Sequence, residues 1–128
     1  MKRIIETSNA PAPIGPYSQA VVLGDVMYCS GQVAINPTNG ELVMGSLNDE
    51  THQVMKNIKA LLDEVGASFD DIVKTSIFLS DMGLFAEVNE IYGSYFTADY
   101  PARETVAVKT LPKSVNVEIS VTVWLGNK

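Results

Sequence analysis

The sequence has 128 residues, of which 46% are hydrophobic, and a formal net charge of −6 at pH 7. This length and composition predict one globular domain spanning residues 1–128 and argue against disorder. The negative charge and the scattered Lys and Arg residues disfavour nucleic acid as a partner, because a phosphate-binding surface needs clustered cations. No apolar run approaches the ~20 residues that cross a bilayer, so we expect no membrane partner.

The single cysteine, Cys29, excludes an intrachain disulfide. With no apolar signal segment at the start of the sequence, we expect a reducing, cytoplasmic location. Cys29 lies in a β-rich run and is interpreted as a buried, unreactive thiol, with a nucleophilic thiol as the alternative. The sequence lacks nucleotide-binding glycine motifs and has too few ligands for a metal site, so we expect no cofactor and no metal.

The N-terminal half predicts three strands followed by a helix. A β-prone run, RIIET, and a proline-rich segment, SNAPAPIGPYSQA, precede two further β-rich runs, QAVVLG and VMYCSGQVAI. Gly24 and Asp25 join these two runs as a tight hairpin. Apolar residues then recur with helical spacing from Leu47 to Val65, with Ser46 placed to cap the start and Gly66 the end.

The C-terminal half predicts a strand, a helix and two more strands. In DIVKTSIFLSD, one face carries Val73, Thr75, Ile77 and Leu79. A helix follows over about 83–96 with Asp81 as its cap, and strands near 103–111 and 115–125 are joined by the turn PKS. The order β-β-β-α-β-α-β-β predicts an α+β fold, in which two helices pack on one face of a mainly antiparallel sheet.

Alternation along the last two strands predicts which side chains share a face. In the final strand, every second residue from Val115 to Leu125 is apolar and faces the helices, which leaves Glu118 on the uncovered side. In the preceding strand, Val106 is assigned to the core, which leaves Arg103 and Thr105 on the uncovered side. Arg103, Thr105 and Glu118 are therefore expected on one face of one hairpin.

An arginine beside a carboxylate suggests an anion-binding site with a proton-handling group. Arg103 can bind a carboxylate through two parallel hydrogen bonds, and a partly buried Glu118 can position or deprotonate water. The alternative is a solvated sheet face on which the two residues form surface ion pairs. The apolar Phe78 and Trp124 on the same predicted face instead favour burial against a partner subunit in a symmetric assembly.

Several segments, in order along nearly the full length, together resemble the reactive intermediate deaminase (RidA, or YjgF-like) family. They are APAPIGPYSQA, CSGQVAINPTNGEL, NIKALLDEVGASFDDIVKTSIFLSDM, FAEVNEIYGSYF and YPARETVAVKTLPKSVNVEIS. The resemblance implies a chorismate-mutase-like fold and a homotrimer whose uncovered sheet faces form a central β-barrel, with active-site clefts between subunits. It also implies hydrolysis of 2-iminobutanoate, 2-iminopropanoate and enamine tautomers such as 2-aminoacrylate to 2-oxo acids and ammonia. Pyridoxal-phosphate dehydratases release these substrates.

The resemblance also implies residue roles. The catalytic residues are Arg103, which holds the substrate carboxylate, and Glu118, which orients the attacking water. The remaining substrate contacts are Tyr17 in GPYSQA, Ser30 and Gly31 in SGQ, Asn89 in EVNEIY, and Thr105. For Ser30 and Gly31, the residues themselves point the same way, since glycine permits close backbone approach to a ligand, although a plain strand end is the alternative.

Thr105 marks a departure from the family, which often reads Pro-Ala-Arg-Ser-Cys-Val where this chain has Pro-Ala-Arg-Glu-Thr-Val. A thiolate nucleophile is therefore excluded at this position. If only backbone groups there contact the substrate nitrogen, threonine suffices; if the thiol is needed, activity is lost. The departure leaves an alternative function open, namely a non-catalytic module that binds a small carboxylate or 2-oxo acid at a trimer cleft. The ribonuclease activity reported within the wider family fits poorly with the negative charge.

Overall fold

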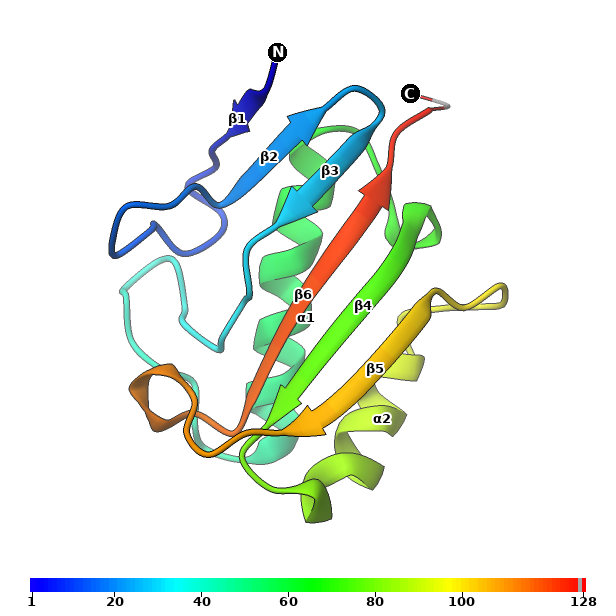
Figure 1. Ribbon diagram of the computed structural model, residues 1–128. Coiled ribbons are helices and arrows are strands. Elements are labelled where there is room, and N and C mark those ends of the chain that lie inside the picture. The colour runs from blue at the N-terminus through cyan, green and yellow to red at the C-terminus, as the bar shows by residue number, and fades with distance from the viewer. Residues whose placement is uncertain (127) are drawn as a thin grey trace.

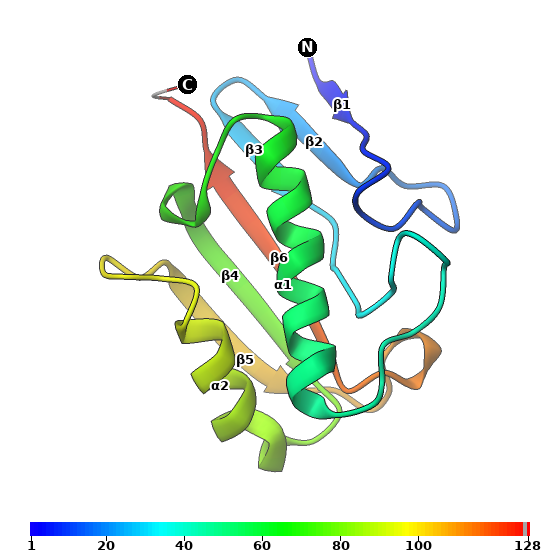
Figure 2. The ribbon, with the colours of Figure 1, turned by 180° about the vertical axis from the view of Figure 1, so that it is seen from behind.

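The computed structural model describes residues 1–126 and 128. One six-stranded sheet has the strand order β1-β2-β3-β6-β4-β5 (Figure 1). Its strands are β1 (Arg3–Ile5), β2 (Ala20–Leu23), β3 (Val26–Cys29), β4 (Ile72–Leu79), β5 (Ala102–Ala107) and β6 (Val117–Trp124). The α-helices, α1 (Leu47–Glu64) and α2 (Phe85–Gly93), both cover the same face of the sheet, as Figure 2 shows from behind. This arrangement confirms the predicted α+β fold and the predicted order of elements.

Helix α1 begins and ends where the sequence predicts. The Ser46 hydroxyl accepts a hydrogen bond of 3.0 Å from the Asp49 backbone N–H, which satisfies one of the free donors of the first turn. Gly66 follows the last turn with a φ of +70°, a left-handed conformation that glycine adopts without strain. The stripe that faces the sheet is fully buried and consists of Val54, Met55, Ile58, Leu61 and Leu62.

The β2–β3 hairpin and the alternation of β6 are also confirmed. Leu23 pairs with Val26 across the turn, and Gly24 there has a φ of +59°. Along β6, residues of one parity are buried under the helices and those of the other parity are partly exposed. Glu118 therefore lies on the uncovered face, as predicted.

The prediction that β5 and β6 form a hairpin is wrong. Strand β4 lies between them and pairs in parallel with β5 and antiparallel with β6. Helix α2 connects β4 to β5, and a helical crossover of this kind joins parallel neighbours. The segment PKS forms a 3-10 turn at Pro112–Ser114 within a longer connection that leads from β5 past the end of β4 to β6.

The parallel pairing also reverses the predicted faces of β5. Arg103 pairs with the buried Thr75, so its side chain lies on the face that the helices cover. Val106 pairs with Phe78 of β4, and Phe78 also pairs with Glu118 of β6. Val106 therefore lies on the uncovered face with Glu118, where it is 44% exposed. A shift of one residue in the assigned alternation moves every side chain of a strand to the other face.

Two smaller differences concern local irregularities. The pairing of β4 with β6 shifts register between Ile72 and Lys74, and Val73 at this bulge is 49% exposed instead of sharing the buried face. The predicted second helix begins as a 3-10 turn (Met82–Leu84) capped by the Asp81 side chain, and α2 ends at Gly93, before the predicted 96. None of the helices in the described residues is long and apolar enough to cross a membrane.

A buried carboxylate ties α1 to the start of β6. Glu50 is 1% exposed, and its oxygens accept hydrogen bonds from the Asn116 backbone N–H at 2.8 Å, the Asn116 amide at 2.9 Å and the Val117 backbone N–H at 3.1 Å. Asn116 in turn accepts a 3.1 Å bond from the Ser80 hydroxyl at the end of β4. This network fixes β6 two residues before Glu118.

Replacement of Glu50 by Ala should destabilise the fold, because it leaves two backbone N–H groups without acceptors in the interior. We expect a loss of roughly 2–4 kcal/mol, since each buried group left without a hydrogen bond costs about 1–3 kcal/mol. Urea unfolding measures the change. The control Glu64→Ala, at an exposed position of α1, should change stability by less than about 0.5 kcal/mol. Equal stability of the two variants would refute the role given to Glu50.

Candidate active site

Arg103 is held by helix α2. Its Nη1 donates a 2.6 Å hydrogen bond to Oδ1 of Asn89, and the centre of the guanidinium lies 5.4 Å from the ring centroid of Tyr92 and 5.5 Å from that of Phe85. A guanidinium within about 6 Å of an aromatic face is attracted by the ring. Arg103 takes part in none of the ion pairs among the described residues, so its charge is not neutralised by an acid.

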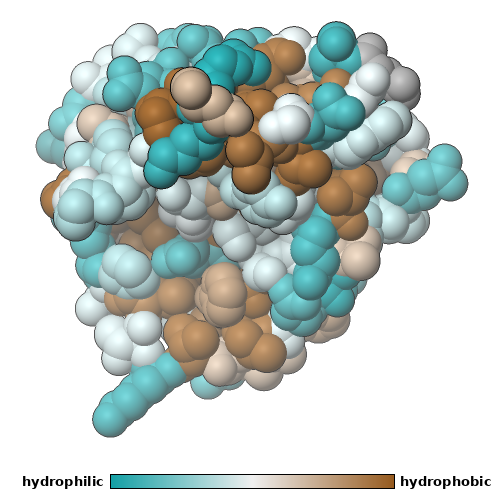
Figure 3. Space-filling view, turned by 45° about the horizontal axis from the view of Figure 1, so that its top comes forward, coloured by the Kyte–Doolittle hydropathy of each residue, from teal (hydrophilic) through white to brown (hydrophobic). Residues whose placement is uncertain are grey.

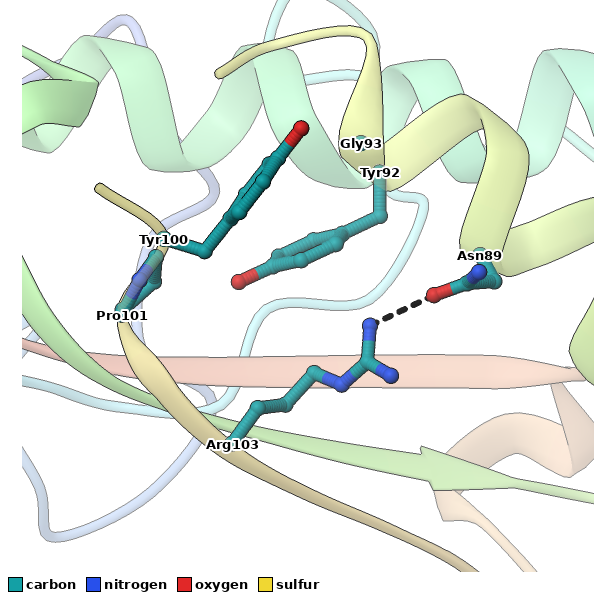
Figure 4. A pocket seen from close by; sticks show the side chains of 6 residues that line it. All are labelled: Asn89, Tyr92, Gly93, Tyr100, Pro101 and Arg103. Atoms are coloured by element: carbon teal, nitrogen blue, oxygen red, sulfur yellow. Dashed lines mark hydrogen bonds between the residues drawn. The ribbon is translucent and has the colours of Figure 1, made fainter. Parts of the chain in front are cut away.

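The guanidinium borders an open cavity of about 470 Å³ (Figure 4). The lining residues come from α2, from the segment that leads into β5 and from β5 itself, and they are Asn89, Tyr92, Gly93, Tyr100, Pro101 and Arg103. Only one N–H group of Arg103 is used by Asn89. Because arginine has five donors, the others can form the paired hydrogen bonds that a carboxylate accepts. The cavity is therefore chemically suited to an organic acid.

Sequence reasoning does not assign a site role to Tyr92 or Tyr100. Helical spacing places Tyr92 in the apolar stripe of the second helix, and its ring is indeed buried, with its hydroxyl donating a 2.9 Å bond to Thr75. Burial raises the pKa of this hydroxyl, which keeps it protonated. The available signal was spacing: Tyr92 lies one helical turn after Asn89, and Tyr100 directly precedes the Pro-Ala-Arg segment.

A second cluster forms around Glu118 on the uncovered face. The Gln32 N–H donates to the Ile119 carbonyl at 2.8 Å, and the Ile119 N–H donates back to Gln32 at 3.1 Å. This bridge presses Gly31 against Glu118, where a Cβ added to Gly31 would lie only 2.8 Å from the carboxylate carbon. Glu118 is half-buried, and this burial raises the pKa of its carboxyl above the ordinary value.

Two further predicted residues lie beside this cluster. Tyr17 is on the proline-rich loop, and Ser30 is at the neighbouring end of strand β3. The Ser30 hydroxyl donates a 2.6 Å bond to the Ser18 carbonyl, and the Ser30 N–H donates to Gln19 at 2.9 Å. Tyr17 is 53% exposed and lines a narrow crevice of about 40 Å³ together with Gly31. The predicted residues Tyr17, Ser30, Gly31 and Glu118 thus come from one region of the fold.

Gln19 organises the loop that carries Tyr17, a role the sequence did not reveal. Its buried side chain donates to the carbonyls of Thr7, Ala10 and Pro11 at 3.0, 3.1 and 2.9 Å, and its oxygen accepts from the Thr7 N–H at 2.8 Å. A segment with several prolines supplies few backbone donors of its own, so a buried amide is an effective way to hold it. The only signal was a glutamine at the edge of an apolar run.

The expectation that Arg103 and Thr105 share a face with Glu118 is wrong. Arg103 and Thr105 pair with Thr75 and Ile77 on the helix side, whereas Glu118 pairs with Phe78 on the uncovered side. One copy of the chain thus holds two separate clusters, Arg103 with Asn89 and Glu118 with Gly31. Thr105 belongs with Arg103, and its hydroxyl is the one buried side-chain polar atom without a hydrogen bond among the described residues.

Cys29 is not part of either cluster. It is 8% exposed, which confirms the predicted burial, and this burial raises the pKa of its thiol to about 12, as expected for a thiol that stays protonated. Within residues 1–126 and 128, no group of three or more His, Cys, Asp or Glu side chains is arranged to hold a metal ion.

The uncovered face of the sheet carries large apolar side chains. Tyr28 and Trp124 are 53% and 43% exposed, and Ile4 and Val106 are 45% and 44% exposed. Figure 3 shows apolar surface gathered over the strands on this side of the molecule. Several large apolar side chains exposed on one face of a sheet are typical of a face that another protein surface covers.

Comparison with known proteins decides the family. The family profile described as endoribonuclease L-PSP matches residues 7–125. A RutC family protein of Pyrococcus horikoshii is 49% identical over 93% of this chain and 94% of its own. The human 2-iminobutanoate/2-iminopropanoate deaminase is 41% identical over 98% of this chain and 92% of its own. A crystal structure from Yersinia pestis, described as a conserved Rid family protein of unknown function, superposes with a TM-score of 0.94 at 47% identity, covering 97% and 99% of the two chains.

The chain belongs to the RidA (YjgF-like) family. The high TM-score at near-complete coverage means that this chain and the Yersinia pestis protein share the same fold over almost their whole lengths. The resemblance inferred from the sequence segments is thereby confirmed. The proline-rich loop, the strand end with Ser30 and the Arg103 segment all lie inside the matched region, residues 7–125.

The raised pKa of Glu118 makes a testable statement about stability. Folding favours the protonated carboxyl, so its contribution to stability is complete below the pKa of an unfolded glutamate, about 4.3, and is lost as the pH rises through the higher folded-state pKa. Glu118→Gln stays neutral and should therefore gain stability relative to the wild type between about pH 4 and pH 7.

Urea unfolding at several pH values measures this difference. Glu64→Gln, at an exposed position of α1, provides the matched control for the substitution itself, and the Glu118→Gln difference is compared with it at each pH. A Glu118→Gln difference that stays flat, or falls with rising pH, would show that Glu118 is not desolvated in the folded protein.

Proposed function

We propose that this protein hydrolyses 2-imino acids such as 2-iminobutanoate and 2-iminopropanoate, and enamine tautomers such as 2-aminoacrylate, to 2-oxo acids and ammonia. The names of relatives at 41–45% identity support this activity. In balanced form, the C=N carbon gains the oxygen of one water, and the nitrogen leaves as ammonia. The catalytic residues are Arg103 and Glu118. The substrate also contacts Tyr17, Ser30, Gly31, Asn89 and Thr105.

The observation that carries the proposal is that the guanidinium of Arg103, which forms no ion pair with an acidic side chain among the described residues, lies at the edge of a cavity. Asn89 and two aromatic rings fix its position before any ligand arrives. A substrate carboxylate bound there is oriented without further ordering of the protein, which favours an attack by water on the neighbouring carbon. An imino acid is already electrophilic, so the reaction needs no covalent bond between the substrate and the protein.

Glu118 manages the protons of the water. A half-buried carboxylate with a raised pKa is a stronger base than an exposed one, and general base catalysis contributes typically about 10²–10⁴-fold. As the water oxygen bonds to the imine carbon, Glu118 takes one of the water protons. It then returns that proton to the nitrogen, which gives an adduct with a hydroxyl and an amino group on the same carbon. Glu118 next moves the hydroxyl proton to the amino nitrogen as the C–N bond breaks, which leaves the 2-oxo acid and ammonia. Gly31 permits this role, because a side chain at that position would displace the carboxylate.

The site we propose forms between copies of the chain, in a homotrimer with the uncovered sheet faces turned inward as a barrel. Two observations support this assembly: Arg103 and Glu118 lie on opposite faces of one chain, and the uncovered face carries exposed apolar side chains such as Tyr28 and Trp124. Symmetric association repeats the same contact at each interface. Each cleft would then combine the Arg103 cluster of one copy with the Glu118 cluster of the next.

Thr105 fits a role that does not need a thiol. Its hydroxyl lacks a hydrogen-bond partner and lies on the same face of β5 as Arg103, two residues away. We infer that Thr105 contacts the substrate nitrogen through its backbone groups only. The proposed setting is the cytoplasm, beside pyridoxal-phosphate dehydratases that release imino acids.

The first test couples the protein to a threonine dehydratase and follows 2-oxobutanoate formation. The wild type should accelerate formation over buffer, and Arg103→Ala should lower kcat/KM by about 10- to 100-fold, as expected for lost hydrogen bonds to a charged group. Arg3→Ala, at an exposed arginine of β1, is the control and should match the wild type. Saturable binding of a 2-oxo acid without any acceleration would instead establish the non-catalytic binding module.

The second test asks whether the two clusters come from different copies. Arg103→Ala and Glu118→Gln, each expected to have well below one quarter of the wild-type activity alone, are co-expressed in equal amounts so that copies mix. A cleft is intact only when one copy supplies Arg103 and the next supplies Glu118, which gives 1/2 × 1/2, or about one quarter, of wild-type activity.

The control for this test co-expresses Arg103→Ala with the double variant, a mixture in which no cleft has Arg103. Its activity should not exceed that of Arg103→Ala alone. No recovery in the first mixture, with mixed assemblies verified by mass, would mean that both residues serve the same cleft from one copy.

A further inference from the structure

The guanidinium of Arg103 is placed by one face of helix α2. Phe85, Asn89 and Tyr92 follow one another at intervals of four and three residues, so their side chains share that face. Asn89 accepts a 2.6 Å hydrogen bond from the guanidinium, whose centre lies 5.5 Å from the ring centroid of Phe85 and 5.4 Å from that of Tyr92. Figure 4 shows Asn89 and Tyr92 reaching from the helix toward the Arg103 side chain. The position of the guanidinium therefore depends on where this face of α2 lies relative to the sheet.

Few polar contacts connect α2 with the sheet. In the part of the chain that the structure describes, two hydrogen bonds do so: the one between Arg103 and Asn89, and one in which the Tyr92 hydroxyl donates to Oγ1 of Thr75 on β4 at 2.9 Å. The first bond ends on Arg103 itself, so it cannot locate the helix independently of that side chain. Among the described residues, the bond between Tyr92 and Thr75 is thus the one hydrogen bond that fixes α2 on the sheet without Arg103.

The bond between Tyr92 and Thr75 lies in the interior. Tyr92 is 4% exposed and Thr75 is 0% exposed, so water cannot take the place of either partner. Burial raises the pKa of the Tyr92 hydroxyl, which therefore stays protonated and remains a donor. Thr75 is also the residue that pairs with Arg103 where β4 and β5 lie side by side. The bond thus aligns α2 with the same point of the sheet from which Arg103 projects.

We propose that Tyr92 and Thr75 are positioning residues for the substrate carboxylate. Their hydroxyl pair holds the Tyr92 ring where it supports the guanidinium of Arg103, and Thr75 acts only through Tyr92. The inference rests on the proposed function and adds two residues that determine how well Arg103 binds the acid group. Without the hydroxyl pair, α2 can shift on the sheet, and the donors of Arg103 no longer meet both carboxylate oxygens in line.

The test measures the Kd of 2-oxobutanoate by calorimetry, kcat/KM in the coupled dehydratase assay, and stability by urea unfolding. Tyr92→Phe keeps the ring and removes the hydroxyl. It should raise Kd and lower kcat/KM by about threefold to tenfold, a factor that matches one hydrogen bond between neutral groups. Thr75→Val keeps the shape of the side chain and should have the same effect. Thr75→Ser keeps the hydroxyl and should stay within about twofold of the wild type in both quantities, although it loses a buried methyl group and some stability.

Comparison with stability separates positioning from general packing. A double variant that combines Tyr92→Phe with Thr75→Val leaves neither hydroxyl buried without a partner, so it should be more stable than Thr75→Val alone. Its Kd and kcat/KM should nevertheless remain as impaired as those of the single variants. If the pair served only to stabilise the fold, the double variant would recover binding together with stability, and that result would overturn the inference.

Tyr95→Phe is the matched control. It removes a tyrosine hydroxyl three residues after Tyr92, one that lies 2.6 Å from Nδ1 of His52 on α1 and bonds to that helix instead of β4. Its Kd and kcat/KM should equal those of the wild type, and equal Kd values for Tyr92→Phe and this control would overturn the inference. Binding of 2-oxobutanoate without acceleration would overturn the deaminase proposal alone, because the Kd values still test the positioning pair. A wild type that neither binds nor accelerates would overturn both.

Discussion

The pairing of β4 with both of its neighbours is the constraint on which the candidate site depends. β4 is parallel to β5 and antiparallel to β6, so it sets the register of β5, which carries Arg103, and shares with β3 the pairing of β6, which carries Glu118. Its buried Thr75 aligns with Arg103, and its half-buried Phe78 aligns with Glu118. The two charged groups are thereby held on opposite sides of one sheet, each in an environment suited to a different chemical task.

Each side of the sheet is stabilised by its own contacts. On the helix side, Tyr92 joins α2 to β4 through Thr75 and provides the ring beneath the guanidinium. On the other side, the bridge between Gln32 and Ile119 holds the strand end with Gly31 against β6, while Glu50 fixes where β6 begins. The positively charged cluster thus depends on helix packing, and the acidic cluster depends on backbone pairing, so substitutions on one side should leave the other in place.

The sequence predicted features that depend on neighbouring residues, such as helix ends and the buried face of a strand. It did not predict which strands pair with each other. The ends of α1 followed from Ser46 and Gly66, and the buried face of β6 followed from simple alternation, because each signal lies within a few residues. The neighbour of β5 is set by the α2 crossover, which a reading of two adjacent strands as a hairpin overlooked. The bulge at Val73 and the contacts of Gln19 depend on residues far apart in the sequence. The motif residues were found, but their distribution over two faces required the structure.

This chain differs in its sulfur chemistry from family members that have a cysteine after the Pro-Ala-Arg motif. Threonine occupies that position, and the one cysteine of the sequence lies in the core with a pKa of about 12. Peroxide and alkylating reagents act on accessible thiolates, and this chain offers none beside its candidate catalytic groups. Exposure to an oxidant would therefore leave the candidate site chemically unchanged, whereas a chain with a reactive thiol at that position would be open to modification.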